Sequence, residues 1–529
     1  MSEKQDIQAV SNDKSDAHPM TAHNDRPDMN MDSPSTTIVT PEDDARIRKK
    51  TDRTILALLT WVYFLQVLDK AVLGTGAIFD LQTDLGLEGS QYSLIGSIAS
   101  MAQLAWQPFS AWLIVRVPHR YLMPSLVLGW GVAETCMSAC NSYGSLLACR
   151  FLLGLFEAGC LPLFAITTGK WYRRSEQPIR VAIWNSTNGL STIISSAISY
   201  GLGHIQSDVL HQWQIIFLFC GLLTVVTAPI VYWKLDNDIS EARFLSPEDR
   251  LKGVHRLQVN QSSLHEDEFK WSQVWEAILD VKTYLWLILA ILPNLGSVLP
   301  SIFGPLIIRG FGFDKYQTLL LNMPFGAVQT TVILLGCFAA NRMKLKGVVL
   351  CCFMLPVVVG TGMLYGFGRE TSDRPALLVA YYIVGFLFAA NPLIVAWAVG
   401  NTGGATKKSV TLSLFQAGLS SGGLIGPLLF NADDAPDYRP GIAGTLGVFI
   451  ALIICAVLQL LVLWHLNKNQ AKRRVANGKS AVIVDKSMET KPMPGGKGHE
   501  EDGAIWDEHS AAARLDLTDR QNDEFVYIY

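Results

Sequence analysis

The chain has 529 residues, of which 50% are hydrophobic and only 17% charged, and its formal net charge is −3. Soluble domains carry about 25% charged residues, so this composition indicates a membrane protein and excludes a basic nucleic-acid-binding protein. The nine cysteines include no CxxC pair and the ten histidines are scattered, so we predict no disulfide framework, no metal site and no cofactor.

The two ends of the chain differ in composition from its middle. Residues 1–53 and 466–529 are polar and rich in charge, which is typical of disordered tails. No apolar core of the signal-peptide type precedes the first long apolar run, so we expect the N-terminus to be retained.

Between these tails lie about twelve apolar runs that are long enough to cross a bilayer, for which a helix needs about 20 residues. Six lie within 54–233 and six within 283–465, separated by the polar segment 234–282. This layout predicts an all-α membrane protein with twelve transmembrane helices in two pseudo-symmetric six-helix bundles around a central cavity. The runs are 54–76, 91–115, 121–141, 145–169, 180–203, 212–233, 283–305, 316–340, 347–367, 375–399, 409–430 and 441–464.

Lys and Arg are concentrated in the tails and in alternate loops. By the positive-inside rule this places both tails and the central segment in the cytoplasm. Within that segment, Ser246-Pro247-Glu248-Asp249 is typical of a helix start. The apolar stripe at 271–278 predicts a helix that lies on the inner membrane surface; docking to a partner is the alternative.

The first run contains Asp69 and Lys70. Adjacent residues of a helix differ by about 100° in direction, so one can face a cavity and the other a neighbouring helix. A buried Lys70 would suit an anionic substrate, although its side chain could instead extend to the outer membrane surface. Asp69 is a candidate counter-ion or proton carrier.

The fourth run contains Arg150, Gly154 and Glu157 on one helical face. A charge near the centre of a membrane helix costs roughly 2.5–3.5 kcal/mol, so such residues usually border a wet interior. Glu134, in the third run, should lie at the depth of Arg150, and we predict an ion pair or a shared network between them, whose role could be purely structural. Glu157 should lie near the midplane as a protonatable carboxylate; a permanently hydrogen-bonded Glu157 is the alternative.

Several uncharged side chains also fall near the predicted midplane. Asn188 lies in the fifth run, together with Trp184, and Asn294 and Asn391 lie in the seventh and tenth. Helices interrupted by Pro or Gly expose polar groups that must be satisfied inside a bundle or by water. We treat these four residues as candidate substrate-binding residues.

Four stretches carry a resemblance to a known family. They are Leu68-Asp69-Lys70, Arg150-x3-Gly154-x2-Glu157-Ala158, Trp171-Tyr172-Arg173-Arg174-x-Glu176-Gln177-x2-Arg180 and Trp397-x3-Asn401-x2-Gly404-x-Thr406-Lys407-Lys408. Across about residues 43–470 the chain resembles the anion:cation symporters of the major facilitator superfamily, and most closely their fungal allantoate permease-like subfamily.

The resemblance implies proton-coupled uptake of a small organic anion, such as a ureide, nicotinate or pantothenate, across the fungal plasma membrane by a monomer. Lys70 and Arg150 would meet the carboxylate, and Glu157, Asp69 or Glu134 would carry the proton. Arg173, Arg174, Glu176, Arg180 and Lys407 would close the inner gate. The bilayer, the anion and the proton are the expected partners.

Other functions remain open at this point. The same fold could export a metabolite or toxin by proton antiport. A nutrient sensor and a multi-span membrane enzyme are further alternatives, but the tails show no signalling module and the chain shows no catalytic constellation. Because the sequence contains no P-loop, it encodes no ATP-driven pump.

Overall fold

The structure is a computed structural model that describes residues 40–173, 176–258, 270–368, 370–480, 517–523 and 525–529, and every element within these ranges is helical. All of these elements belong to one compact unit, Val39–Tyr529. Arg174, one of the predicted gate residues, lies outside the described residues.

The N-terminal half contains six long helical stretches, one of them made of two helices. They coincide with the first six apolar runs. These helices are α2 (Ala57–Ile78), α4 (Gln91–Arg116), α5 (His119–Met137), α6 (Tyr143–Glu157) with α7 (Cys160–Trp171), α8 (Gln177–Leu202) and α9 (Gln212–Lys234). The short helix α3 (Leu81–Asp84) follows α2.

The C-terminal half repeats this layout at the positions of the last six runs. Its long helices are α12 (Val281–Ser301), α14 (Lys315–Met343), α15 (Lys346–Gly366), α16 (Arg374–Val384) with η3 (Gly385–Ala389) and α17 (Ala390–Gly400), α18 (Ala405–Ile425) and α19 (Arg439–Ala476). Three short helices, α13 (Gly304–Gly310), η4 (Gly426–Leu429) and η5 (Ala432–Asp434), connect them.

Nine helices in the described part of the chain are long and apolar enough to cross a membrane. The helices α4, α5 and α8 are not among the nine. Two of these three carry amides on the wall of a cavity, Gln103 and Gln107 in α4 and Asn185 and Asn188 in α8. These polar side chains lower the mean hydropathy of helices that are otherwise of spanning length.

Two of the predicted continuous helices are broken. The fourth run divides after Glu157 into α6 and α7, and the tenth contains a 3₁₀ segment, η3, just before Asn391. Both breaks therefore lie beside a polar residue that the sequence placed near the midplane. Discontinuous helices that line an internal site are a recurring feature of secondary transporters.

Both predicted tails are partly wrong, because each contains ordered residues. Thr40 caps α1 (Pro41–Thr51) through a 3.2 Å bond from the amide of Asp43, and the π-helical turn η1 (Asp52–Leu56) joins α1 to α2. At the other end α19 continues to Ala476, and residues 517–523 and 525–529 include buried side chains such as that of Tyr527. Composition alone did not reveal these two ordered segments, because they are polar and their partners are charged groups elsewhere in the chain.

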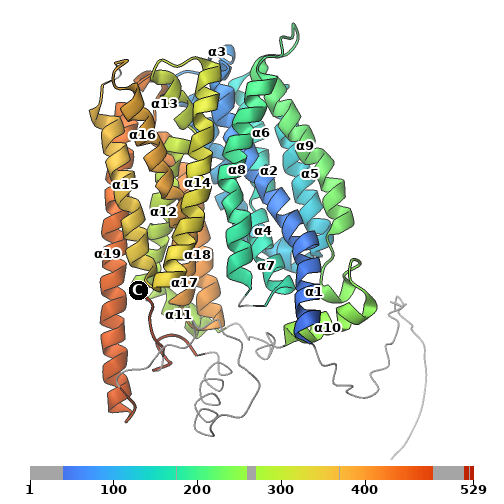
Figure 1. The fold of residues 1–529 in the computed structure, drawn as a ribbon, viewed down its shortest axis with the longest axis vertical. Coiled ribbons are helices and arrows are strands. Elements are labelled where there is room, and N and C mark those ends of the chain that lie inside the picture. The colour runs from blue at the N-terminus through green and yellow to red at the C-terminus, as the bar shows by residue number, and fades with distance from the viewer. Residues whose placement is uncertain (1–39, 174–175, 259–269, 369, 481–516, 524) are drawn as a thin grey trace, which may run out of the picture. The chain divides into compact units, whose positions relative to one another are not determined.

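The central segment forms helices, as predicted. They are η2 (Ile239–Glu241), α10 (Pro247–Gln258) and α11 (Trp271–Ile278), and Ser246 caps the second of them. Figure 1 shows α1, α10 and α11 at one end of the two bundles and α3 and α13 at the other. We call these the basic end and the opposite end.

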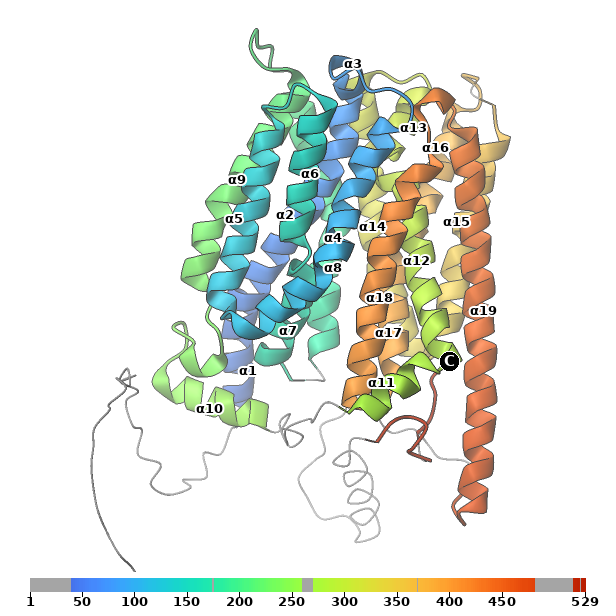
Figure 2. The ribbon, with the colours of Figure 1, turned by 180° about the vertical axis from the view of Figure 1, so that it is seen from behind.

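The two halves meet along two pairs of helices. The helix α8 packs against α14, and α4 packs against α18, as the two views in Figures 1 and 2 also show. The closest backbone approach is between Gly189 of α8 and Gly326 of α14, where a Cβ atom on either glycine would overlap the carbonyl oxygen of the other. Glycine is required at this crossing because no side chain fits.

Candidate functional site

A cavity of about 3430 Å³ lies between the halves and is lined by both of them. All six predicted substrate-binding residues are on its wall. They are Lys70, Arg150, Trp184 and Asn188 from the N-terminal half and Asn294 and Asn391 from the C-terminal half. Glu157 is on the same wall, whereas Asp69 and Glu134 are not among the lining residues.

The charged group of this wall is built from α2, α4 and α6. Lys70 Nζ lies 3.7 Å from Glu157 Oε1, and Gln103 donates a 2.6 Å hydrogen bond from Nε2 to Glu157 Oε2. The Lys70 side chain is half exposed, whereas that of Glu157 is 1% exposed. Lys70 thus faces the cavity and does not extend to the outer membrane surface. Arg150 is a second cation on this wall. It is buried and lies on one helical face with Glu157.

Asp69 points away from the cavity, as the 100° step between adjacent helical residues predicts. It is buried, and its carboxyl group lies near enough to that of Glu134 in α5 for one to donate a hydrogen bond to the other. Another donor near the pair in the described part of the chain is the indole N–H of Trp130, which lies close to Asp69. Chemically, the pair is suited to hold one proton between two carboxyl groups.

Of the two predicted arrangements of Glu134 and Arg150, the described residues show no direct ion pair but do show a shared network, because Arg150 lies near Glu134, Asp69 and Glu157. Among the described residues no basic side chain donates a hydrogen bond to either carboxyl oxygen of Glu134. The sequence argument matched the depths of the two residues along their helices. Depth does not fix the direction in which a side chain points, and Glu134 faces Asp69 instead.

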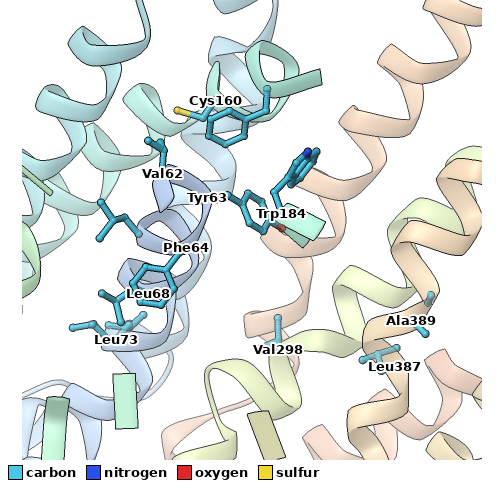
Figure 3. Close-up of a cluster of buried hydrophobic side chains, with 14 of the residues drawn as sticks. Val62, Tyr63, Phe64, Leu68, Leu73, Cys160, Trp184, Val298, Leu387 and Ala389 are labelled. Atoms are coloured by element: carbon cyan, nitrogen blue, oxygen red, sulfur yellow. The ribbon is translucent and has the colours of Figure 1, made fainter. Parts of the chain in front are cut away.

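An aromatic and amide cluster lies towards the basic end from this charged group. Tyr63 donates to Asn185 Oδ1 at 3.2 Å and accepts from Asn188 Nδ2 at 3.0 Å, and its ring packs edge-on against Trp184 at a centroid distance of 4.9 Å. Figure 3 shows Tyr63 of α2 and Trp184 of α8 turned towards each other. The sequence analysis missed Tyr63, although it lies seven residues before Lys70 and therefore on the same helical face.

The wall contributed by the C-terminal half is uncharged near these groups. Asn294 of α12 and Asn391 of α17 exchange two hydrogen bonds, at 3.1 and 3.3 Å. Gln329 of α14 accepts from Thr192 of α8 at 3.1 Å, across the contact between the halves. A ligand in the cavity therefore meets charge on one side and amides on the other.

The predicted gate residues form two separate clusters at the basic end. In the N-terminal half, Arg180 pairs with Asp52 at 2.8 Å, Arg173 pairs with Asp44 at 3.2 Å, and Glu176 pairs with Arg256 of α10. These bonds tie α8 and the loop before it to α1 and α10.

Lys407, the remaining gate residue, is buried in the C-terminal half. Its Nζ lies 2.9 Å from carboxylate oxygens of Glu276, Asp280 and Asp519. The structure thus does not bring Lys407 together with Arg173, Glu176 and Arg180.

The halves are joined by polar contacts at the opposite end. Arg309 of α13 donates to Ile78 O at 2.7 Å and pairs with Asp80 at 3.2 Å, and Lys315 of α14 donates to Gln212 at 3.0 Å. At the basic end the cavity wall includes Arg173 on one half and Lys408 on the other. The cavity is therefore closed by side chains at the opposite end and reaches the basic end. Within the described ranges no group of three or more His, Cys, Asp or Glu residues could hold a metal ion.

Comparison with known proteins identifies this architecture. The chain is 29% identical to the thiamine pathway transporter THI73 of Saccharomyces cerevisiae, over 92% of this chain and 86% of that protein. It is 29% identical to the allantoate permease of the same yeast, over 83% of this chain and 82% of the permease. The fold matches the inward open xylose transporter XylE from E. coli with a TM-score of 0.59 and 11% identity, over 77% of this chain and 95% of XylE. Residues 59–427 match the profile of the Major Facilitator Superfamily, so the chain is a multi-pass membrane transporter that belongs to this family.

Proposed function

We propose that this protein is a proton-coupled symporter that takes up a small organic anion, and that it belongs to the allantoate permease-like group of anion:cation symporters. The pair formed by Lys70 and Glu157 on the cavity wall carries the proposal. The similarity to the allantoate permease supports the substrate class, since that protein's name denotes a carboxylate.

Coupling follows from the competition for one cation. An anion that enters the cavity approaches the half-exposed ammonium group of Lys70 and draws it away from Glu157. Glu157 is then a buried carboxylate whose remaining hydrogen bond among the described residues comes from the amide of Gln103. A buried charge without a partner is costly, so Glu157 takes up a proton. Anion and proton thus enter the binding site together.

Asp69 and Glu134 form a second proton site behind the first. Both are buried between α2 and α5, and a proton shared by the two carboxyl groups removes the repulsion between them. Arg150 lies near Asp69, Glu134 and Glu157, so its charge acts on all three. A change in the protonation of Glu157 therefore changes the field at the second site.

We assign the basic end to the cytoplasm and the membrane to the plasma membrane. The loops and helix ends there carry the excess of Lys and Arg, which the positive-inside rule places inside. In this orientation the cavity is open inward, and Arg309 with Asp80 closes it outward. Transport then proceeds by rocking of the halves about the contacts of α8 with α14 and α4 with α18.

Uptake of radiolabelled carboxylates by a permease-deficient yeast tests the function. A panel of monocarboxylate vitamins and ureides should contain a substrate that accumulates when the external pH is lowered. Glu157→Gln should abolish this accumulation and leave counterflow, while the exposed Glu88→Gln serves as a matched control. Concentrative uptake by Glu157→Gln would refute the coupling role, and accumulation only in the outward direction would favour the exporter.

A further inference from the structure

The last residues of the chain are held in a polar site at the basic end of the C-terminal half. We refer to residues 517–523 and 525–529 as the C-terminal segment. Asp519 is 0% exposed and pairs with Lys407 Nζ at 2.9 Å and with Lys282 Nζ. Gly403 N at 3.2 Å and the Tyr527 hydroxyl at 2.8 Å also donate to its carboxylate. Burial alone would raise the pKa of Asp519, but the two ammonium groups outweigh it and lower the pKa.

The backbone of the segment is recognised as well. Asn401 donates to Ile528 O at 2.9 Å and accepts from Ile528 N at 2.7 Å, and Trp397 donates to the same carbonyl at 2.8 Å. Asn467 of α19 makes the equivalent two bonds with Tyr527, at 2.8 and 2.9 Å. Side-chain amides that pair with both the N–H and the C=O of a residue bind a peptide regardless of its side chains.

The extension of α19 beyond the predicted span completes the site. Gln470 donates to the carbonyl oxygens of Asp519 and Asn522 at 2.8 and 3.2 Å. The Tyr527 ring is 2% exposed and lies under the ammonium group of Lys282 at 4.8 Å. The segment thus contacts α12, the end of α17, the start of α18 and α19, all in one half.

The buried cluster around Lys282 and Lys407 has equal numbers of positive and negative charges both with and without the segment. The site itself supplies Lys282 and Lys407 against Glu276 and Asp280. To this cluster the segment adds the negative Asp519 and the positive Arg520, which pairs with Asp280 at 3.2 Å. Asp523 of the segment pairs outside the cluster, with Lys479 at 3.2 Å. Stranding a buried charge is what makes the loss of an ion-pair partner costly. One charge of each sign leaves this buried cluster with the segment, so release does not change the formal charge of the cluster.

The position of the segment links it to transport. Leu517, Asn522 and Phe525 line the central cavity, next to Gly403 and Lys408 at the start of α18. Closure at the basic end must bring this part of the C-terminal half towards the N-terminal half. A docked segment adds side chains to the cavity wall on the side that must approach the N-terminal half.

We propose that the basic end of the C-terminal half is a binding site for the chain's own C-terminal segment, and that the docked segment holds the cavity open at that end. Release of the segment would allow the halves to close there. This inference rests on alternating access of the proposed transporter but not on its substrate or on its coupling to protons.

The first test measures docking by hydrogen exchange on the purified full-length protein without substrate. Residues 517–529 should be protected, and Asp519→Asn should raise their exchange by at least about tenfold, because it removes the charge that pairs with two buried lysines. Asn467→Ala, which leaves the charge cluster intact, should act in the same direction. Asp523→Asn is the matched control. It also removes a carboxylate from the segment, but one whose contact, with Lys479, is more exposed, so exchange should rise less than in Asp519→Asn. Absence of protection in the wild-type protein would overturn the binding site.

The second test measures closure by the distance between spin labels on the two halves. Lys170→Cys in α7 and Ser409→Cys in α18 are exposed positions, and serine replaces the exposed cysteines Cys136 and Cys352. Asp519→Asn and Asn467→Ala should shift the distribution to shorter distances than in the wild-type protein. If either variant releases the segment and the distances stay the same, the segment does not hold the cavity open. Neither readout requires transport, so failure of the proposed symport would leave both unchanged.

Discussion

Lys70 and Glu157 face each other across the wall of the cavity, with Lys70 Nζ 3.7 Å from Glu157 Oε1, and only the lysine is substantially exposed. The two side chains thus differ in their access to the cavity. An anion can reach the cation without reaching the carboxylate, so substrate binding separates the pair and leaves Glu157 buried. The same two residues therefore link the binding of the anion to the binding of the proton.

Lys70→Gln tests the anion-binding part of this link. A charged hydrogen bond contributes about 1.5–3 kcal/mol, and Lys70 is half exposed, so we expect the substrate concentration for half-maximal uptake to rise about tenfold. Uptake kinetics in yeast measure it. Lys49→Gln, an exposed lysine of α1, removes the same charge outside the cavity and should leave it unchanged. Equal half-saturation in the Lys70 variant and the wild type would exclude direct contact with the anion.

Asp69→Asn and Glu134→Gln test whether the second pair acts as one unit. Each substitution leaves an amide that can donate to the remaining carboxylate, so we expect the protein to fold but to lose most of its pH-driven accumulation. Residues that share one proton should be non-additive, and the double variant should accumulate about as much as the worse single variant. Asp208→Asn, at an exposed loop position, is the control. Multiplicative losses in the double variant would show two independent roles.

The sequence located the charged residues of the cavity but not their partners. Lys70 and Glu157 each interrupt an apolar run, and a charge in such a run must border a polar interior. Which side chain meets which depends on the rotation of each helix about its axis, and a single sequence carries no information on that angle. Glu134 was therefore placed in a network with Arg150, which it shares, but its direct partner Asp69 was missed.

The C-terminal segment was missed for a different reason. Composition classifies a polar stretch as a tail because it cannot bury enough apolar surface to fold by itself. Here Asp519 is held by Lys282, 237 residues earlier in the chain. An ion pair between residues so far apart in the chain leaves no periodic pattern in the sequence. The long helices, by contrast, could be located because their apolar residues recur within a short stretch.

Asp249 of α10 should give the basic end a dependence on acid pH. Burial disfavours its charge, but Arg46 and Lys50 of α1 bond to it at 2.7 and 2.8 Å and hold the pKa of Asp249 at about 2, below its usual 3.8. The folded pKa is the lower one, so the stabilisation is complete above about pH 4 and is lost as the pH falls towards 2. Because Arg46 and Lys50 are nearly half exposed, we expect the ionised Asp249 to contribute only about 1 kcal/mol to the free energy of unfolding.

Thermal unfolding of Asp249→Asn in detergent measures this contribution. The variant should unfold about 2 °C below the wild type at pH 7, and the difference should disappear as the pH is lowered through 4 to 2. Asp208 is exposed and forms no ion pair with the described residues, so Asp208→Asn should match the wild type throughout. A difference that persists at pH 2 would mean that packing, and not the charge of Asp249, is responsible.

Gly326→Ala should disable the contact about which the halves rock. The new methyl group would overlap the carbonyl oxygen of Gly189 and come within 2.8 Å of Ile193 Cγ1, so α8 and α14 must separate, and overpacking of this kind typically costs about 1–3 kcal/mol. Gly362→Ala in α15 adds the same methyl group where no atom lies within 4 Å, and alanine favours a helix by about 1 kcal/mol over glycine. We therefore expect Gly326→Ala to lower Tm. If the same energy is lost when the halves rock, the transport rate should fall at least about tenfold. Gly362→Ala should leave both Tm and the transport rate unchanged. Wild-type transport by Gly326→Ala would show that the halves do not need this close approach.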